Sequence, residues 1–207
     1  MLNKLKLGLL ILCLPIAAFA ASFEEGKHYE TIKVEKSKNL QITEFFSFYC
    51  PHCYNFEPVA HALEENLPKG AVFIKNHVNF LGGASPQAQS NLSYAYLIAK
   101  KHGVESAVAA QIFNSIHKLR APLLNITDVK KLMELNGISN EVFDKDLVSM
   151  PIVVAEQEME DKQNQYSKLG ALTGVPTFIV NDKYKINVNA VKSQEELNEL
   201  ATFLLAL

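Results

Sequence analysis

The 207-residue sequence lacks tryptophan and contains only three cysteines. Cys13 lies in an apolar N-terminal segment, whereas Cys50 and Cys53 form a close pair in the body of the chain. A chain of this size can bury a core without covalent cross-links. A single close pair therefore argues against the multi-disulfide scaffold of small secreted domains. Without tryptophan, any intrinsic fluorescence assay has to rely on tyrosine.

A strong net charge and long internal hydrophobic runs are also absent. The formal net charge is −2, and removing the two lysines within residues 1–20 changes it to −4. This weak negative balance argues against a nucleic-acid partner. No apolar run after the N-terminal segment is long enough to cross a bilayer. We therefore expect a soluble mature protein, and the sequence shows no repeats or long linkers.

The N-terminal segment has the pattern of a secretory signal peptide. Lys4 and Lys6 precede a short apolar core over residues 7–15, and Ala18-Phe19-Ala20 fits a cleavage site. The apolar core is too short to span a bilayer. We predict a signal peptide over residues 1–20, with export and cleavage after Ala20. An uncleaved N-terminal anchor is the alternative.

The next segments alternate between strand and helix patterns. Residues 40–48 and 72–78 are rich in aromatic and β-branched side chains and predict buried strands. Residues 51–67 predict a helix between them, and residues 33–35 a short edge strand. This order is typical of an α/β fold.

A helical block interrupts the α/β pattern. Residues 85–170 have helical periodicity, and strands are predicted again at 177–180 and 184–188 around an Asn181-Asp182 hairpin turn. A final helix follows Ser193. The helical block is most simply an insertion between two halves of one α/β unit.

Capping residues mark several of the predicted helices. Thr127 can cap a helix that ends at Gly137, and Ser139 can cap the next one. Ser193 and Glu196 form a capping box before the final helix.

The most informative segment is Cys50-Pro51-His52-Cys53, at the junction of a predicted strand and helix. Cysteines at positions i and i+3 lie on one face of the first helical turn. Pro51 takes the first helical position, where its missing N–H has no consequence. The free amides and the helix dipole stabilise an anion there. We predict that Cys50 is rich in thiolate and that Cys53, one turn further in, is the poorer nucleophile.

This arrangement predicts reversible disulfide exchange. In the oxidising direction, a substrate thiolate attacks Cys50, and a second substrate thiol then displaces Cys50 as a stable thiolate. His52 can hydrogen-bond the thiolate or, when charged, attract it. Stabilising the reduced form makes the disulfide a stronger oxidant.

Three other interpretations remain open. A structural disulfide that closes so short a loop would remove only about 2 kcal/mol of chain entropy, against about 4.7 kcal/mol for a 100-residue loop. A zinc site would need two more ligands, and His61 and His77 fit ordinary surface or strand positions. His52 could also be a solvated residue without a role. No metal or organic cofactor is expected.

Several motifs resemble one known family. Residues 45–54, Phe-Phe-Ser-Phe-Tyr-Cys-Pro-His-Cys-Tyr, resemble the active-site segment of the DsbA family of periplasmic thiol:disulfide oxidoreductases. Residues 77–80 with Gly82-Gly83 resemble that family's entry into its helical insertion. Residues 174–177 resemble its cis-proline loop. The similarity runs from Phe23 to the final helix.

The resemblance implies a thioredoxin fold with an inserted α-helical domain. Residues 21–82 and 163–207 would form the thioredoxin-like domain, and residues 83–162 the insertion. The chain would act in the periplasm.

The resemblance also assigns roles at the site. It implies that Cys50 is the exposed, attacked cysteine and Cys53 the buried, resolving one. It implies that Val175-Pro176 is cis and packs beside the disulfide. A proline without an N–H can present bare backbone to an extended substrate.

Each of two charged residues has two possible interpretations. Glu44 is either a solvent-facing strand residue or, as the resemblance implies, a buried carboxylate below the dithiol that aids proton transfer at Cys53. Lys75, on the neighbouring predicted strand, is either an exposed lysine or the partner of Glu44. Pro58 lies inside the predicted helix and is expected to kink it.

The leading functional hypothesis is a dithiol oxidase that donates the Cys50-Cys53 disulfide to unfolded or newly exported proteins. The resemblance supplies a membrane partner, the quinone-linked reoxidant DsbB. A disulfide isomerase or reductant on the same fold is the alternative. The short segment before the first strand leaves no obvious dimerisation domain, so a monomer is expected. A peptide-binding chaperone without redox chemistry is the third hypothesis.

Overall fold

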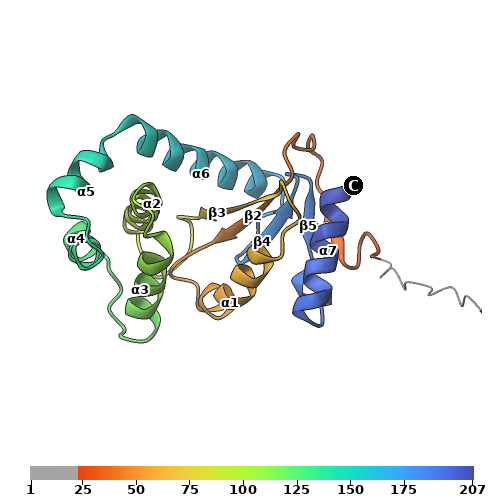
Figure 1. Cartoon of the computed structure of the whole chain (residues 1–207), viewed down its shortest axis with the longest axis horizontal. Helices are drawn as coiled ribbons and strands as arrows, with labels where there is room; N and C mark the ends of the chain where they lie inside the picture. Colours follow the sequence, from red (N-terminus) through yellow and green to blue (C-terminus); the bar gives the residue numbers. More distant parts are fainter. Residues whose placement is uncertain (1–22) are drawn as a thin grey trace, which may run out of the picture.

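The computed structural model describes residues 23–207, so the predicted signal peptide lies outside the described residues. A five-stranded sheet in the order β1-β5-β4-β2-β3 forms one end of the molecule (Figure 1). β2 and β3 are parallel, and the other neighbouring strands are antiparallel. The strands are β1 (Tyr29–Thr31), β2 (Gln41–Phe46), β3 (Val72–His77), β4 (Thr177–Val180) and β5 (Tyr184–Ile186).

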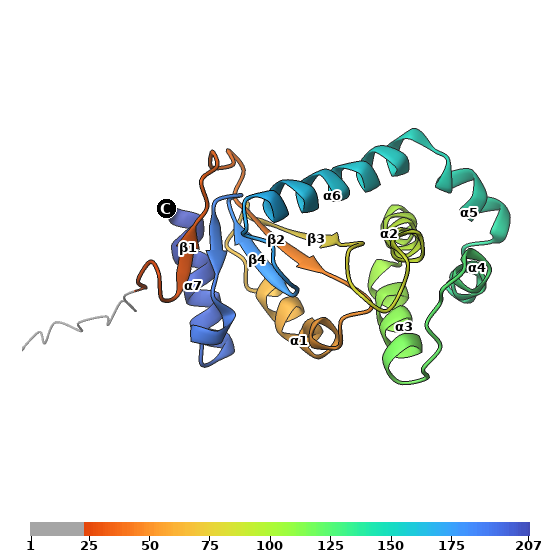
Figure 2. The same cartoon turned by 180° about the vertical axis from the view of Figure 1, so that it is seen from behind.

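The central strand β2 explains why its sequence is apolar along its whole length. All six of its residues are buried, because β3 and β4 flank it and helices cover both faces of the sheet. On one face, Ile42 packs with α1 (Pro51–Glu65) and α7 (Gln194–Ala206). On the other face, Phe45 packs against Tyr166 near the end of α6 (Met150–Lys168). Figures 1 and 2 show these two layers from opposite sides.

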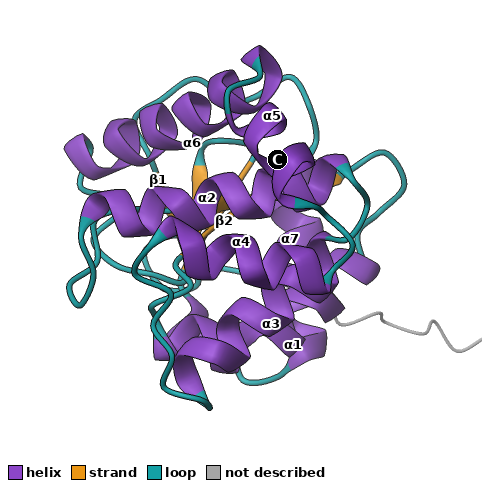
Figure 3. Ribbon diagram, turned by 90° about the vertical axis from the view of Figure 1, so that its left-hand side faces the viewer, coloured by secondary structure: helices purple, strands orange, loops and turns teal. Residues whose placement is uncertain are grey.

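The remaining helices gather at the end of the molecule away from α7 (Figure 1), and Figure 3 views the molecule from this end. They share a core with the end of β2 and the start of α1, because Phe46, Phe48 and Cys53 belong to the same buried cluster as the helical side chains. The long helix α6 then leads the chain back to the sheet. These helices are α2 (Pro86–Lys101), α3 (Glu105–His117), α4 (Ile126–Leu135) and α5 (Asn140–Leu147).

Most predicted elements and several predicted turns are confirmed. Asn181 and Asp182 have positive φ angles and join β4 to β5 as a hairpin. Ser139 caps α5 through its side chain. Ser193 caps α7, but the Glu196 carboxylate accepts a hydrogen bond from Lys192 N, so the capping box is incomplete.

Two local predictions were wrong. The edge strand lies at Tyr29–Thr31 rather than at 33–35, because Tyr29 and Thr31 are the residues in register with β5. The cap of α4 is Asn125, whose side-chain oxygen accepts the Asp128 N–H, and Thr127 already lies inside the helix.

None of the helices within residues 23–207 is both long and apolar enough to cross a membrane. The division into a domain of residues 21–82 with 163–207 and an insertion of 83–162 stays a prediction. Helix α6 continues without a break across position 162.

Candidate active site

The Cys50-Pro51-His52-Cys53 motif joins the end of β2 to the start of α1, as predicted. Cys50 is the N-cap of α1, and its sulfur accepts a hydrogen bond from the Cys53 N–H at 3.2 Å. Pro51 occupies the first helical position, where no intrahelical N–H bond is required. The Cys50 side chain therefore lies against the free amides of the first turn.

Both cysteines are free thiols in this structure. Cys53 has no solvent exposure, as the resemblance implied. Cys50 is only 4% exposed and is therefore buried, so the expectation of an exposed Cys50 was wrong. The Cys50 sulfur lies 3.3 Å from the carbonyl oxygen of Val175, and this contact helps to bury the sulfur. His52 is exposed to solvent.

The surroundings shift the pKa values of the two thiols in opposite directions. The pKa of Cys50 is lowered to about 6, first by a hydrogen bond from the Cys53 thiol and then by the amides of Cys53 and His52 and the charge of His52. These effects outweigh burial, which opposes ionisation. The pKa of Cys53 is raised, because its thiol donates to Cys50 and is buried. The arrangement therefore makes Cys50 the nucleophile.

The peptide bond between Val175 and Pro176 is cis, as the resemblance implied. The bond lies directly before β4, and β4 pairs with β2. This pairing places residues 175–176 beside Cys50, although they are 125 positions away in the sequence. Pro176 has no N–H to offer here, and the Val175 carbonyl oxygen lies 3.3 Å from the Cys50 sulfur.

Glu44 and Lys75 lie opposite each other on β2 and β3. Glu44 has no solvent exposure, which excludes the interpretation that it is a solvent-facing strand residue. Lys75 Nζ lies 3.1 Å from Glu44 Oε2. This contact is an ion pair between strands β2 and β3. Lys75 also pairs with Glu57 on α1 at 2.5 Å.

Burial and neighbouring charges oppose each other in setting the pKa of each member of this pair. The pKa of Glu44 is raised to about 7 because burial outweighs the attraction of Lys75. For Lys75, burial acts to lower the pKa, but the charges of Glu44 and Glu57 outweigh it and the pKa is raised. Near neutral pH, Glu44 can therefore gain or lose a proton while Lys75 stays charged.

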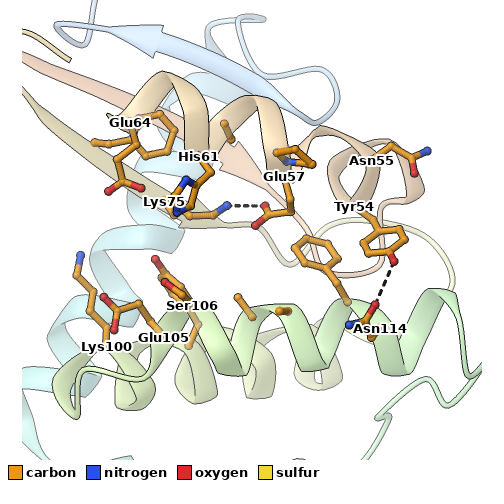
Figure 4. A pocket seen from close by; sticks show the side chains of 17 residues that line it. Tyr54, Asn55, Glu57, His61, Glu64, Lys75, Lys100, Glu105, Ser106 and Asn114 are labelled. Atoms are coloured by element: carbon orange, nitrogen blue, oxygen red, sulfur yellow. Dashed lines mark hydrogen bonds and ion pairs between the residues drawn. The ribbon is translucent and has the colours of Figure 1, made fainter. Parts of the chain in front are cut away.

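A pocket of about 640 Å³ between α1 and α3 gives this charged group a route to solvent. Figure 4 shows Lys75 and Glu57 facing each other at its wall, with Glu64 and Lys100 nearby. The Lys75 side chain is 14% exposed and that of Glu44 is not exposed, so Lys75 is the member of the pair that reaches solvent.

The sequence did not reveal two histidines that support the active-site loop. His77 is buried, and its Nε2 accepts the Phe48 N–H at 3.1 Å. His117 Nε2 lies 2.8 Å from the Phe48 carbonyl oxygen. His61 lies apart from both on α1, with its side chain 63% exposed. Within residues 23–207, no group of three or more His, Cys, Asp and Glu side chains is arranged to hold a metal ion.

Comparison with known proteins decides the family. A family model described as "DSBA-like thioredoxin domain" matches residues 41–201. The chain belongs to the DsbA-like thioredoxin family. The thiol:disulfide interchange protein DsbA of Escherichia coli K12 is 35% identical over 191 residues, which cover 90% of this chain and 87% of that protein.

Solved DsbA structures have the same fold. The structure of Proteus mirabilis DsbA with a non-covalently bound peptide has a TM-score of 0.80 at 24% identity, and covers 90% of this chain and 100% of its own. A crystal structure of the disulfide oxidoreductase DsbA from Proteus mirabilis has a TM-score of 0.77 at 27% identity, with 90% and 98% coverage. The predicted thioredoxin fold is confirmed. This DsbA-like chain is a thiol:disulfide oxidoreductase that oxidises protein thiols.

Proposed function

We propose that the protein acts in the periplasm and donates its Cys50–Cys53 disulfide to cysteine pairs of unfolded or newly exported proteins. The observation that carries the proposal is the position of Cys50, whose sulfur caps α1 and has a pKa lowered to about 6. A sulfur that is stable as a thiolate is a good leaving group, so the disulfide gives up its oxidising equivalents readily.

The proposed reaction has two exchange steps. A client thiolate attacks the Cys50 sulfur, the Cys50–Cys53 bond breaks, and the electron pair goes to Cys53. A second client thiolate then attacks the client sulfur of the mixed disulfide, which forms the client disulfide and releases Cys50 as a thiolate. The client loses two electrons and the enzyme gains two.

Other residues support these steps. Cys53 leaves as a thiolate and takes up a proton, and Glu44, whose pKa is raised to about 7, is the proposed donor, with Lys75 as its partner. Val175 and Pro176 are proposed to line the position of the client chain, because the Val175 carbonyl already contacts Cys50. The exposed imidazole of His52 is proposed to stabilise the Cys50 thiolate.

The cycle needs an external oxidant to restore the disulfide. We propose a membrane partner of the DsbB type, which passes the two electrons from Cys50 and Cys53 to a quinone. The protein is proposed to act as a monomer after cleavage at Ala20. A client peptide and this partner would both meet the protein at Cys50, so the two compete.

The redox equilibrium of the mature protein with glutathione tests the direction of the reaction. A potential well above about −180 mV supports a dedicated oxidase, whereas a value near −270 mV identifies a reductant. Cys50→Ser should abolish exchange with a reduced client. Cys53→Ser, mixed with a client that carries a disulfide, should instead accumulate a mixed disulfide, because its Cys50 thiolate attacks the client disulfide and no second enzyme thiol releases the client. Full activity in Cys50→Ser would overturn the proposal in favour of a chaperone.

A further inference from the structure

The backbone of Phe48, two residues before Cys50, is held by two imidazole rings from opposite sides. Its N–H points to His77 on β3, and its carbonyl oxygen points to His117 at the end of α3. Phe48 has no solvent exposure, so its backbone groups have to find partners inside the protein. One partner comes from the sheet and the other from the helical part of the chain.

The hydrogen bonds assign a tautomer to each ring. A backbone N–H only donates, so His77 Nε2 carries no proton and its Nδ1–H donates to Ser93 Oγ at 2.8 Å. A carbonyl oxygen only accepts, so His117 Nε2 carries a proton and donates to Phe48 at 2.8 Å. Burial lowers the pKa of His77 to about 3, which agrees with a neutral ring there.

His117 has further contacts with the start of α1. Its ring stacks on Tyr54 with a centroid distance of 5.2 Å and an interplanar angle of 11°. The Tyr54 hydroxyl donates to Asn114, one turn before His117 on α3. The orientation of the imidazole is therefore fixed by the first turn of α1 as well as by its own helix.

The held peptide lies within the turn that leads to the nucleophile. The Cys50 N–H donates to the Ser47 carbonyl oxygen at 3.0 Å, which closes this turn around Phe48. A rotation of the Phe48 peptide would therefore shift Cys50 relative to the first-turn amides. The Cys50 sulfur is 3.2 Å from the Cys53 nitrogen, so a small shift would weaken that bond.

We infer that His117 is a positioning residue for the redox centre: by donating to the Phe48 carbonyl, it fixes the turn that presents the Cys50 sulfur to the N-terminus of α1. The inference rests on the proposed role of Cys50 as the attacked cysteine. It gives the helical part of the chain a share in setting the oxidising power of the dithiol.

The test compares His117→Leu, which removes the donor, with His117→Gln, whose amide N–H can replace it. The mature protein is used in both redox forms. The readouts are the Cys50 pKa from thiolate absorbance, the equilibrium constant with glutathione, and thermal stability. His61→Leu, which removes an exposed imidazole on α1, is the matched control. His117→Asn, with an amide too short to reach Phe48, replaces His117→Leu if that variant does not fold.

His117→Leu is expected to raise the Cys50 pKa and to weaken the protein as an oxidant of glutathione about fivefold, which corresponds to one hydrogen bond of ordinary net strength. His117→Gln should restore most of the loss, and His61→Leu should match the parent. Equal losses of stability in the two redox forms, with an unchanged pKa and equilibrium constant, would show a purely structural role and overturn the inference.

The same assays separate this inference from the proposed function. If the parent exchanges with glutathione, Cys50→Ser does not, and His117→Leu behaves as the parent, only the inference fails. If the parent itself does not exchange, the proposed function fails first.

Discussion

Lys75 Nζ lies 3.1 Å from Glu44 Oε2, in a pair whose carboxylate has no exposure to solvent. A buried ion pair gains Coulomb attraction but loses the hydration of both ions. Here the loss of hydration is the larger effect on Glu44, whose pKa is raised to about 7. Lys75 is also shared with Glu57, so its single positive charge serves two carboxylates.

The raised pKa of Glu44 predicts a pH-dependent stability. The folded protein binds the Glu44 proton more tightly than the unfolded chain, so this contribution is fully present below pH 4.5 and is lost as the pH rises through about 7. Glu44→Gln does not titrate at this position. The parent should therefore lose about 3 kcal/mol of unfolding free energy relative to Glu44→Gln between pH 4 and pH 8. Denaturant unfolding at several pH values measures this difference, and parallel curves for the two proteins would refute it.

The lowered pKa of Cys50 predicts the pH profile of its reaction with an alkylating agent. The rate for the reduced protein should follow a single titration with a midpoint near pH 6. His52→Leu removes a charge that favours the thiolate, so the midpoint should rise and the protein should become a weaker oxidant, by up to about tenfold per pKa unit. His61→Leu, on the same helix, serves as the control. An unchanged midpoint in His52→Leu would mean that His52 has no electrostatic role.

The buried imidazole of His77 predicts a loss of stability in acid. Burial lowers its folded-state pKa from 6.5 to about 3, so the unfolded chain binds a proton that the folded protein excludes. Stability is therefore lost as the pH falls from 6.5 towards 3. Relative to His77→Asn, the parent should lose roughly 4 kcal/mol over this range. Equal acid sensitivity in the two proteins would contradict a neutral, buried His77.

A core substitution far from the dithiol should separate stability from redox chemistry. Leu200 on α7 is fully buried against β4 and α1. Leu200→Ala should lower the free energy of unfolding by about 2–5 kcal/mol through the cavity it leaves. The equilibrium constant with glutathione should stay unchanged, since Leu200 belongs to a different buried cluster from Cys50 and Cys53. A shift in that constant similar to the effect of His52→Leu would show that the two properties are coupled.

The sequence predicted those features whose signals are local. The cysteine pair at a strand-to-helix junction and the Asn181-Asp182 turn depend on neighbouring residues, and both were found as predicted. Thr127 and Asn125 are both capping residue types two positions apart, and α4 uses Asn125. Such a choice depends on where the loop enters the helix, which residue type alone does not determine.

The active-site features that the sequence did not predict have another physical cause. His117 meets Phe48 across 69 residues of sequence, and His77 meets it across 29. Nothing in the local pattern of either histidine distinguishes it from an ordinary polar residue of a helix or strand. The low exposure of Cys50 was missed for the same reason, because its cover comes from Val175, in a distant loop.

The order of strands in the sheet affects how the protein folds during synthesis. Strand β2 pairs with β3 nearby in the chain, but with β4 only after more than a hundred intervening residues. A chain that emerges from its N-terminus therefore presents Cys50 and Cys53 long before the backbone that covers them has arrived. Until β4 docks, both thiols belong to a half-built sheet with an open edge. During its own synthesis the enzyme therefore shares a requirement with its clients: its cysteines must avoid mispairing until β4 pairs with β2.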